Sequence, residues 1–129
     1  MDYKKLIEAA VKAKENSYSP YSKFRVGAAV LTEGGSVYIG ANIENASYGA
    51  TVCAERSAVI RAVMEGEKKI KAIAIAGDTE EYIYPCGICR QVLAEFAGDD
   101  AEVICTRKNG EYRAIKLGDM LPDAFRGGK

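Results

Sequence analysis

One short stretch combines a thiol, a carboxylate and a guanidinium at the expected start of a helix. In "TVCAERSAV", Cys53 is followed two residues later by Glu55 and then by Arg56. A surface helix has no need of the thiol, and a core helix has no use for the two charges. The combination therefore predicts chemistry at this helix start.

A second stretch, "YPCGICRQ", places Cys86 and Cys89 as a C-x-x-C pair at the start of another predicted helix. In an open α/β sheet, helices that follow strands begin near the strand ends where ligands bind. We therefore expect Cys53 to converge with this pair at two facing helix N-termini. Free amide N–H groups and the helix dipoles favour anionic sulfur there.

Three thiolates form a ligand set that suits Zn²⁺. A structural zinc site takes a fourth protein ligand, whereas a catalytic site leaves that position to water. Glu55 lies close enough to Cys53 to reach such a water without being needed as a ligand. Arg56 can offset the negative charge of the thiolates by donating hydrogen bonds. The three residue types would thus serve as ligand, proton shuttle and charge compensator.

The composition fits a single catalytic domain over residues 1–129. The chain is 48% hydrophobic, which is enough for a core. It carries 18 basic and 18 acidic residues, and this balance of charge argues against a nucleic-acid binder. The N-terminus lacks the apolar segment of a secretory signal, and no apolar run reaches the length of a membrane span. We therefore expect a cytoplasmic protein without membrane contact, whose four cysteines are thiols or metal ligands. Since histidine is absent, sulfur or oxygen must hold any metal.

The hydropathy pattern predicts elements in the order α-β-β-α-β-α-β-β. Helices are expected after Asp2, from Cys53 to about Glu65, and between Pro85 and Gly98. Strands are expected over "RVGAAVL", "VYIGANI", "KAIAIA", "AEVICT" and "EYRAIK". This order predicts an α/β protein, a three-layer α/β/α sandwich around a five-stranded mixed sheet. The helix after Cys53 is apolar on more than one face, which a subunit interface would explain.

Two other interpretations of the cysteines stay open from the residues alone. A C-x-x-C pair beside a β-α-β unit can be a redox dithiol, although this leaves the stretch around Cys53 unexplained. A structural zinc site would use Cys105 as its fourth ligand. Cys105 lies inside the apolar strand "AEVICT", where a cysteine more commonly serves as a small buried hydrophobe.

The pattern C-A-E followed about thirty residues later by P-C-x-x-C matches the three-cysteine form of a known signature of zinc-dependent base deaminases. The chain resembles the short, homotetrameric cytidine deaminases over nearly its whole length. Five segments carry the resemblance: "PYSKFRVGAAV" (20–30), "GANIENASY" (40–48), "CAERSA" (53–58), "PCGICRQV" (85–92) and "LPDAF" (121–125).

The resemblance implies a reaction as well as a fold. It implies zinc-dependent hydrolytic deamination of cytidine and 2′-deoxycytidine to the uridines, with release of ammonia. It assigns the zinc ligands to Cys53, Cys86 and Cys89 and the proton shuttle to Glu55. Related deaminases of other amino-heterocycles, such as the antibiotic blasticidin S, share this core and remain an alternative.

The resemblance also implies roles for residues outside the metal centre. Arg56 and Gln91 match positions that tune the thiolate charge. Phe24 matches a residue that contacts the pyrimidine, and Asn42 and Glu44 match residues that bind the ribose. Ala46, Tyr48 and Phe125 match residues in active sites that are shared between subunits. The backbone N–H of Ala54 is a further candidate donor to the pyrimidine carbonyl. Tyr84 departs from the family, which usually has Ser or Thr before Pro-Cys.

Overall fold

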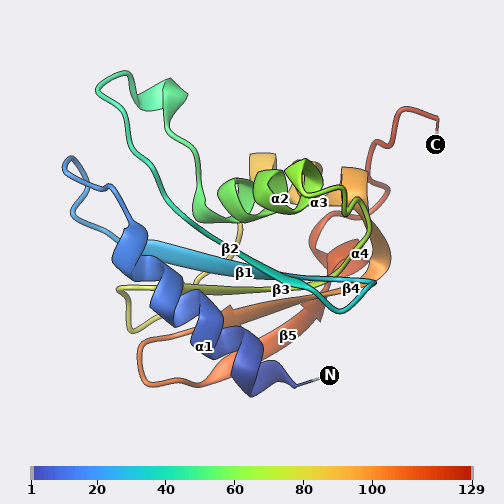
Figure 1. The fold of residues 1–129 in the computed structure, drawn as a ribbon, viewed down its shortest axis with the longest axis horizontal. Coiled ribbons are helices and arrows are strands. Elements are labelled where there is room, and N and C mark those ends of the chain that lie inside the picture. The colour runs from blue at the N-terminus through green and yellow to red at the C-terminus, as the bar shows by residue number, and fades with distance from the viewer. Residues whose placement is uncertain (1, 129) are drawn as a thin grey trace.

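A five-stranded mixed sheet separates two layers of helices in the computed structural model, which describes residues 2–128 (Figure 1). The strands lie in the order β2-β1-β3-β4-β5. Only β3 and β4 run parallel; every other neighbouring pair is antiparallel. The strands are β1 (Val26–Thr32), β2 (Val37–Ala41), β3 (Ile70–Gly77), β4 (Ala97–Thr106) and β5 (Tyr112–Lys116).

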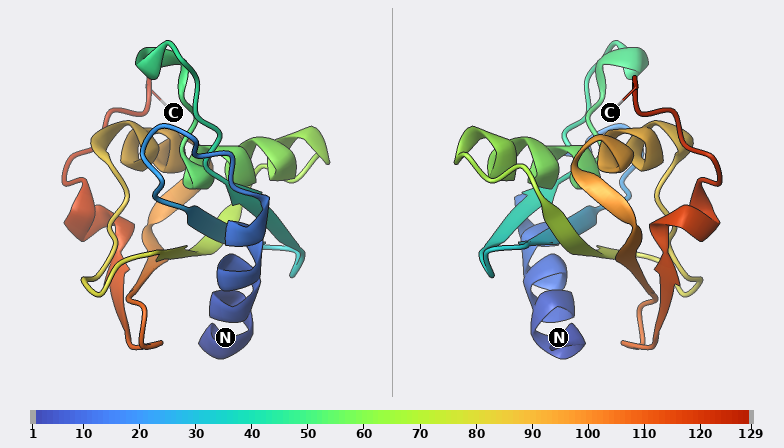
Figure 2. Two further views of the ribbon diagram at one scale, coloured as in Figure 1. Left: turned by 90° about the vertical axis from the view of Figure 1, so that its left-hand side faces the viewer. Right: turned by 90° about the vertical axis from the view of Figure 1, so that its right-hand side faces the viewer.

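The helices divide between the two faces of this sheet (Figure 2). One face is covered by α1 (Tyr3–Ala13), and the other by α2 (Ala54–Met64), α3 (Gly87–Phe96) and the single turn α4 (Leu117–Met120). Two short 3₁₀ turns, η1 (Lys14–Asn16) and η2 (Tyr48–Ala50), complete the described elements. No helix among residues 2–128 has both the length and the apolar character needed to cross a bilayer.

Two glycines allow the helices to lie directly on the sheet. A Cβ atom added at Gly27 in β1 would stand 2.1 Å from the carbonyl oxygen of Ala10 in α1. A Cβ atom at Gly40 in β2 would stand 2.3 Å from the backbone nitrogen of Ala58 in α2. Because no side chain fits in either gap, these glycines fix how closely each helix layer approaches the sheet.

The predicted order of elements and the sandwich are confirmed, but two boundaries were wrong. The second strand ends at Ala41. Asn42 lies beyond it, because the N–H of Val26 donates to the side-chain Oδ1 of Asn42 at 2.9 Å and not to a backbone oxygen of a partner strand. The fourth strand begins at Ala97, before the predicted segment "AEVICT", because Ala97 is already extended and pairs with Ile70 of β3. Helix α3 lies between Pro85 and Gly98, as predicted.

Asp78, just after β3, ties three parts of the chain together. Its carboxylate lies 3.1 Å from the Nζ of Lys14 in η1 and 2.8 Å from the Nε of Arg25, which leads into β1. The hydrogen bond from Arg25, followed by that from Lys14, lowers the pKa of Asp78 to about 2. This cluster holds the end of β3 against the start of β1, near the end of the sheet where the site described below is built.

We predict that Asp78→Asn lowers the free energy of unfolding at neutral pH by about 1 kcal/mol. Since the pKa of Asp78 is lower in the folded chain than in the unfolded one, its contribution is present above about pH 4 and disappears as the pH falls toward 2. The difference in stability between wild type and variant should therefore shrink across that window, as measured by urea unfolding at several pH values. Asp100→Asn is the matched control, because Asp100 is 95% exposed and 3.6 Å from Lys116; an equal effect there would contradict the prediction.

Candidate active site

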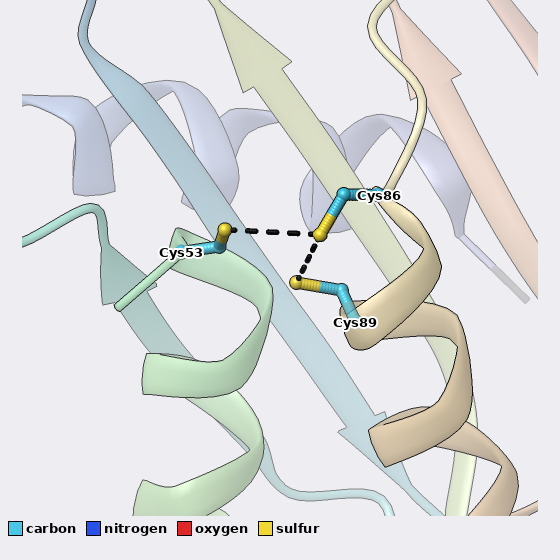
Figure 3. Close-up of side chains that lie close together, drawn as sticks. All are labelled: Cys53, Cys86 and Cys89. Carbon is cyan, nitrogen blue, oxygen red and sulfur yellow. Dashed lines mark hydrogen bonds between the residues drawn. The ribbon is translucent and has the colours of Figure 1, made fainter. Parts of the chain in front are cut away.

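Three sulfur atoms meet where the N-terminal ends of α2 and α3 face each other (Figure 3). Cys53 is the residue before α2, Cys86 is the residue before α3, and Cys89 lies in the first turn of α3. The Sγ atoms of Cys53 and Cys86 are 3.9 Å apart, and those of Cys86 and Cys89 are 3.5 Å apart. The predicted convergence of these three thiols is confirmed.

This sulfur triangle fits a tetrahedral zinc ion. Sulfur atoms bound at about 2.3 Å from one Zn²⁺ lie roughly 3.8 Å from one another, and the observed separations bracket that value. All three sulfur atoms lie within 4.8 Å of one another, and within residues 2–128 no other Cys, Asp or Glu joins the group. Cys105 is instead fully buried in the core between the sheet and α2. The described residues thus offer three candidate ligands for a metal ion.

Arg56 lies against the sulfur triangle from within α2. Its Nη2 donates to the Sγ of Cys53 at 3.5 Å and to the carbonyl oxygen of Thr51 at 3.2 Å. The pKa of the Cys53 thiol is lowered to about 5, first by a hydrogen bond from Cys89 and then by Arg56. The guanidinium therefore favours an anionic sulfur at the helix start.

Glu55 is buried in the first turn of α2, with 5% of its surface exposed. It lines a cavity of about 200 Å³ beside Cys53 and Cys86. Burial raises the pKa of the Glu55 carboxyl group to about 7. A carboxyl group with this pKa can both take up and release a proton near neutral pH.

Asn42 and Glu44 lie in the segment that joins β2 to α2, and hydrogen bonds hold both side chains. The Nδ2 of Asn42 donates to the carbonyl oxygen of Phe24 at 2.9 Å. The Oε1 of Glu44 accepts from the N–H groups of Tyr21 and Ser22 at 3.0 and 3.1 Å, and Oε2 accepts from the Ser22 hydroxyl. Both residues lie outside the strand, because β2 ends at Ala41.

These two residues line neighbouring cavities rather than one. Asn42 borders the cavity that contains Glu55, whereas Glu44 borders a second cavity of about 290 Å³ together with Tyr21 and Tyr48. Thr51 lines both cavities. The two cavities therefore adjoin at Thr51, one beside Cys53 and Cys86 and the other beside Glu44.

Phe24 is half-buried next to the cavity wall. A Cβ atom added at Gly77 would stand 2.7 Å from the Cδ1 of Ile83 and 3.3 Å from the Phe24 ring, so both side chains cover the bare end of β3. Ile83 in turn lines the cavity that contains Glu55. Ala54 begins α2, where backbone N–H groups have no partner within the helix.

The remaining predicted residues lie toward the surface. Ala46 is exposed, and Tyr48 and Phe125 are 75% and 77% exposed. The segment around η2 and the C-terminal tail both protrude on the side of the sheet that carries α2 and α3 (Figures 1 and 2). Gln91 donates from its Nε2 to the carbonyl oxygen of Phe125 at 2.8 Å, and the described residues show no hydrogen bond from it to a thiol.

Sequence reasoning missed two polar residues that organise the site. Thr51 opens the cysteine stretch, and its carbonyl oxygen accepts from Arg56. Ser22 lies within the "PYSKF" segment and contacts Glu44 through both its N–H and its hydroxyl group. The signal for Thr51 was its place two residues before Cys53, but nothing in local sequence connects Ser22 to a residue 22 positions away.

Comparisons with known proteins agree with this geometry. A family model described as "Cytidine and deoxycytidylate deaminase zinc-binding region" matches residues 1–106. Cytidine deaminase of Halalkalibacterium halodurans is 49% identical over 97% of this chain and 95% of its own length. That of Sporosarcina psychrophila is 48% identical over 97% and 92%.

The crystal structure of cytidine deaminase from Burkholderia pseudomallei has the same fold. It superposes with a TM-score of 0.93 at 48% identity and covers 97% of this chain and 100% of that one. The sulfur triangle, the buried glutamate beside it and these matches lead to one assignment. The chain belongs to the cytidine and deoxycytidylate deaminase family, whose defining segment is a zinc-binding region.

Proposed function

We propose that this chain is a zinc-dependent cytidine deaminase, which hydrolyses cytidine and 2′-deoxycytidine to the uridines and releases ammonia. Residues 1–129 act as one catalytic domain in this proposal. The observation that carries it is the buried carboxyl group of Glu55, which lines a cavity bordered by Cys53 and Cys86. The named activity of relatives nearly half identical to this chain supports the choice of substrate.

Cys53, Cys86 and Cys89 would hold the zinc ion through their thiolates, one ion in each subunit. When bound, zinc lowers the pKa of water and so makes a nucleophile available at neutral pH. Arg56 and the N-terminal ends of α2 and α3 offset the charge of the three thiolates. Gln91 remains a predicted second tuning residue, although its described hydrogen bond goes to the tail.

Glu55 moves the protons in the proposed reaction. Its carboxylate takes a proton from the attacking water and delivers it to N3 of the pyrimidine ring, while the water oxygen bonds to C4. It then passes a second proton from the new hydroxyl group to the amine. The C4–N bond breaks, a carbonyl group forms at C4, and ammonia leaves. The burial that raises the pKa of Glu55 suits a group that must accept and donate in turn.

The nucleoside would lie along the two adjoining cavities. Phe24 and the Ala54 N–H group contact the pyrimidine, whereas Asn42 and Glu44 bind the ribose hydroxyl groups. Asn42 keeps one amide hydrogen after donating to Phe24, and a carboxylate has more acceptor sites than the three that Glu44 uses. A carboxylate at this position also repels phosphate, so the site favours nucleosides over nucleotides.

We further propose a homotetramer with active sites shared between subunits. Ala46, Tyr48 and Phe125 would reach a neighbouring subunit's site, since all three are exposed on protruding segments. Ile60 and Met64 on α2 are 53% and 78% exposed, which leaves an apolar surface for subunit contact. The reduced thiols suit a cytoplasmic enzyme that uses neither nucleic acid nor membrane as partner.

Replacing Glu55 with Gln should abolish turnover while leaving fold and metal intact. Because the amide cannot accept and return a proton, we expect kcat for cytidine to fall by about 10³-fold. Ultraviolet absorbance follows deamination, and elemental analysis verifies the zinc content. Undiminished turnover would refute the proton-shuttle role, and faster turnover of blasticidin S than of cytidine by the wild type would refute the choice of substrate.

The ligand set can be separated from the structural-zinc alternative by a pair of matched variants. We predict that Cys89→Ser loses zinc, because it removes a ligand from the sulfur triangle. Cys105→Ser should keep a full equivalent of zinc and lose only stability, by about 1–3 kcal/mol, since it buries a hydroxyl group in the core. The zinc content of the purified proteins distinguishes the two ligand sets. Loss of metal from the Cys105 variant would overturn the three-ligand assignment.

Sharing of active sites predicts complementation between two inactive variants. Phe125→Ala lacks the shared aromatic ring, and Glu55→Gln lacks the proton shuttle. If Phe125 serves a neighbouring subunit, assemblies containing both variants regain roughly a quarter of wild-type activity, because random mixing pairs an intact Glu55 with a neighbour's intact Phe125 in that fraction of sites. Failure to regain activity in assemblies verified by light scattering would show that each chain uses its own Phe125.

A further inference from the structure

Tyr84 is a wall residue of the cavity that contains Glu55, and it lies two residues before Cys86. Its side chain is held from outside the site, because the Nη1 of Arg113 donates to the Tyr84 hydroxyl at 2.5 Å. Arg113 belongs to β5, the edge strand of the sheet. A residue of the sheet edge therefore contacts the cavity wall across 29 positions of sequence.

The contact is part of a stack of alternating guanidinium groups and aromatic rings. The guanidinium carbon of Arg113 lies 5.9 Å from the Tyr84 ring centre and 5.7 Å from that of Tyr82. Arg107 lies 4.8 Å from the Tyr82 ring centre and pairs with Glu111 at 2.6 Å. Arg113 is thus the member of the stack that connects it to the cavity wall.

The backbone on either side of Tyr84 is also fixed. The N–H of Ile83 donates to the carbonyl oxygen of Thr106 at the end of β4, at 3.0 Å. The Nε of Arg90 donates to the carbonyl oxygen of Pro85 at 2.8 Å. Because a residue before proline has few backbone conformations, the anchoring of the Tyr84 ring constrains the chain that leads to Cys86.

We propose that Arg113 is a positioning residue that acts through Tyr84 to fix the cavity wall and the thiol of Cys86. Arg113 contacts neither the sulfur triangle nor the cavity lining other than Tyr84 among the described contacts. Its effect therefore reaches the site through one hydroxyl group and one ring. This inference rests on the proposed function, since it assigns Cys86 to the metal.

The test compares Arg113→Met, Tyr84→Phe and the double variant with wild type. Arg107→Met is the matched control, because Arg107 stacks on Tyr82 in the same way but does not contact Tyr84. Three measurements are made on each protein: release of zinc to a chromogenic chelator, the visible absorption spectrum of the cobalt-substituted protein, and kcat and KM for cytidine. Thermal unfolding monitors the fold, which should persist because Arg113 is exposed.

We expect zinc release to accelerate roughly fivefold in Arg113→Met and in Tyr84→Phe, the change that corresponds to losing one hydrogen bond. The double variant should match Arg113→Met, since that variant already removes the hydrogen bond that Tyr84→Phe removes. The cobalt spectrum should shift in all three and stay unchanged in Arg107→Met, and kcat should fall more than KM rises.

Wild-type values in Arg113→Met for zinc release and cobalt spectrum would overturn the proposal. So would an equal change in Arg107→Met, because the effect would then be general loosening of the turn between β4 and β5. Additive effects in the double variant would show that Arg113 acts by another route. Zinc release and the cobalt spectrum do not require turnover, so they decide the matter even if wild type fails to deaminate cytidine.

Discussion

The site depends on two helix N-termini that face each other closely enough for their cysteine sulfur atoms to meet (Figure 3). Helix α2 reaches this position because Gly40 lets it lie directly on β2. Helix α3 reaches it because β3 and β4 run parallel, so the connection between them must return across the sheet and begins near the end of β3. A side chain at Gly40 or a different order of strands would separate the sulfur atoms and leave no ligand set.

Gathering thiolates creates an electrostatic problem that the surrounding residues solve. A hydrogen bond from Cys89, and after it the hydrogen bond and charge of Arg56, lower the pKa of the Cys53 thiol and so favour its anionic form. Glu55, two residues further along in the first turn of α2, is buried where a charge is unfavourable, and its pKa rises. The pKa values of two acidic groups that are two residues apart are thereby shifted in opposite directions. In the proposed function, the anionic sulfur of Cys53 holds the metal and the carboxyl group of Glu55 exchanges protons.

Local sequence predicted the parts of this molecule that depend on periodicity and motif spacing. The order of elements, the helix that begins after Asp2 and the meeting of the cysteines followed from hydropathy and residue type. It failed where a side chain replaces a backbone partner, as Asn42 does beyond β2, because such a bond depends on a residue 16 positions away. The link from Arg113 to Tyr84 was hidden for the same reason, since only the sheet brings β5 to the cavity wall.

Hydrogen bonds to a side chain outside regular structure also affect which ligands the site binds. Glu44 lies outside regular structure, yet the Ser22 hydroxyl and the N–H groups of Tyr21 and Ser22 hold it in one place. The hydrogen bond from Ser22, above all, lowers the pKa of Glu44, so its carboxylate stays ionised in the cavity that it lines with Tyr21 and Tyr48. An ionised carboxylate accepts hydrogen bonds from neutral hydroxyl groups and opposes phosphate. In the proposed function, selectivity for the sugar part of a ligand depends on Glu44, which a loop fixes, while the reaction depends on Glu55, which is buried in a helix.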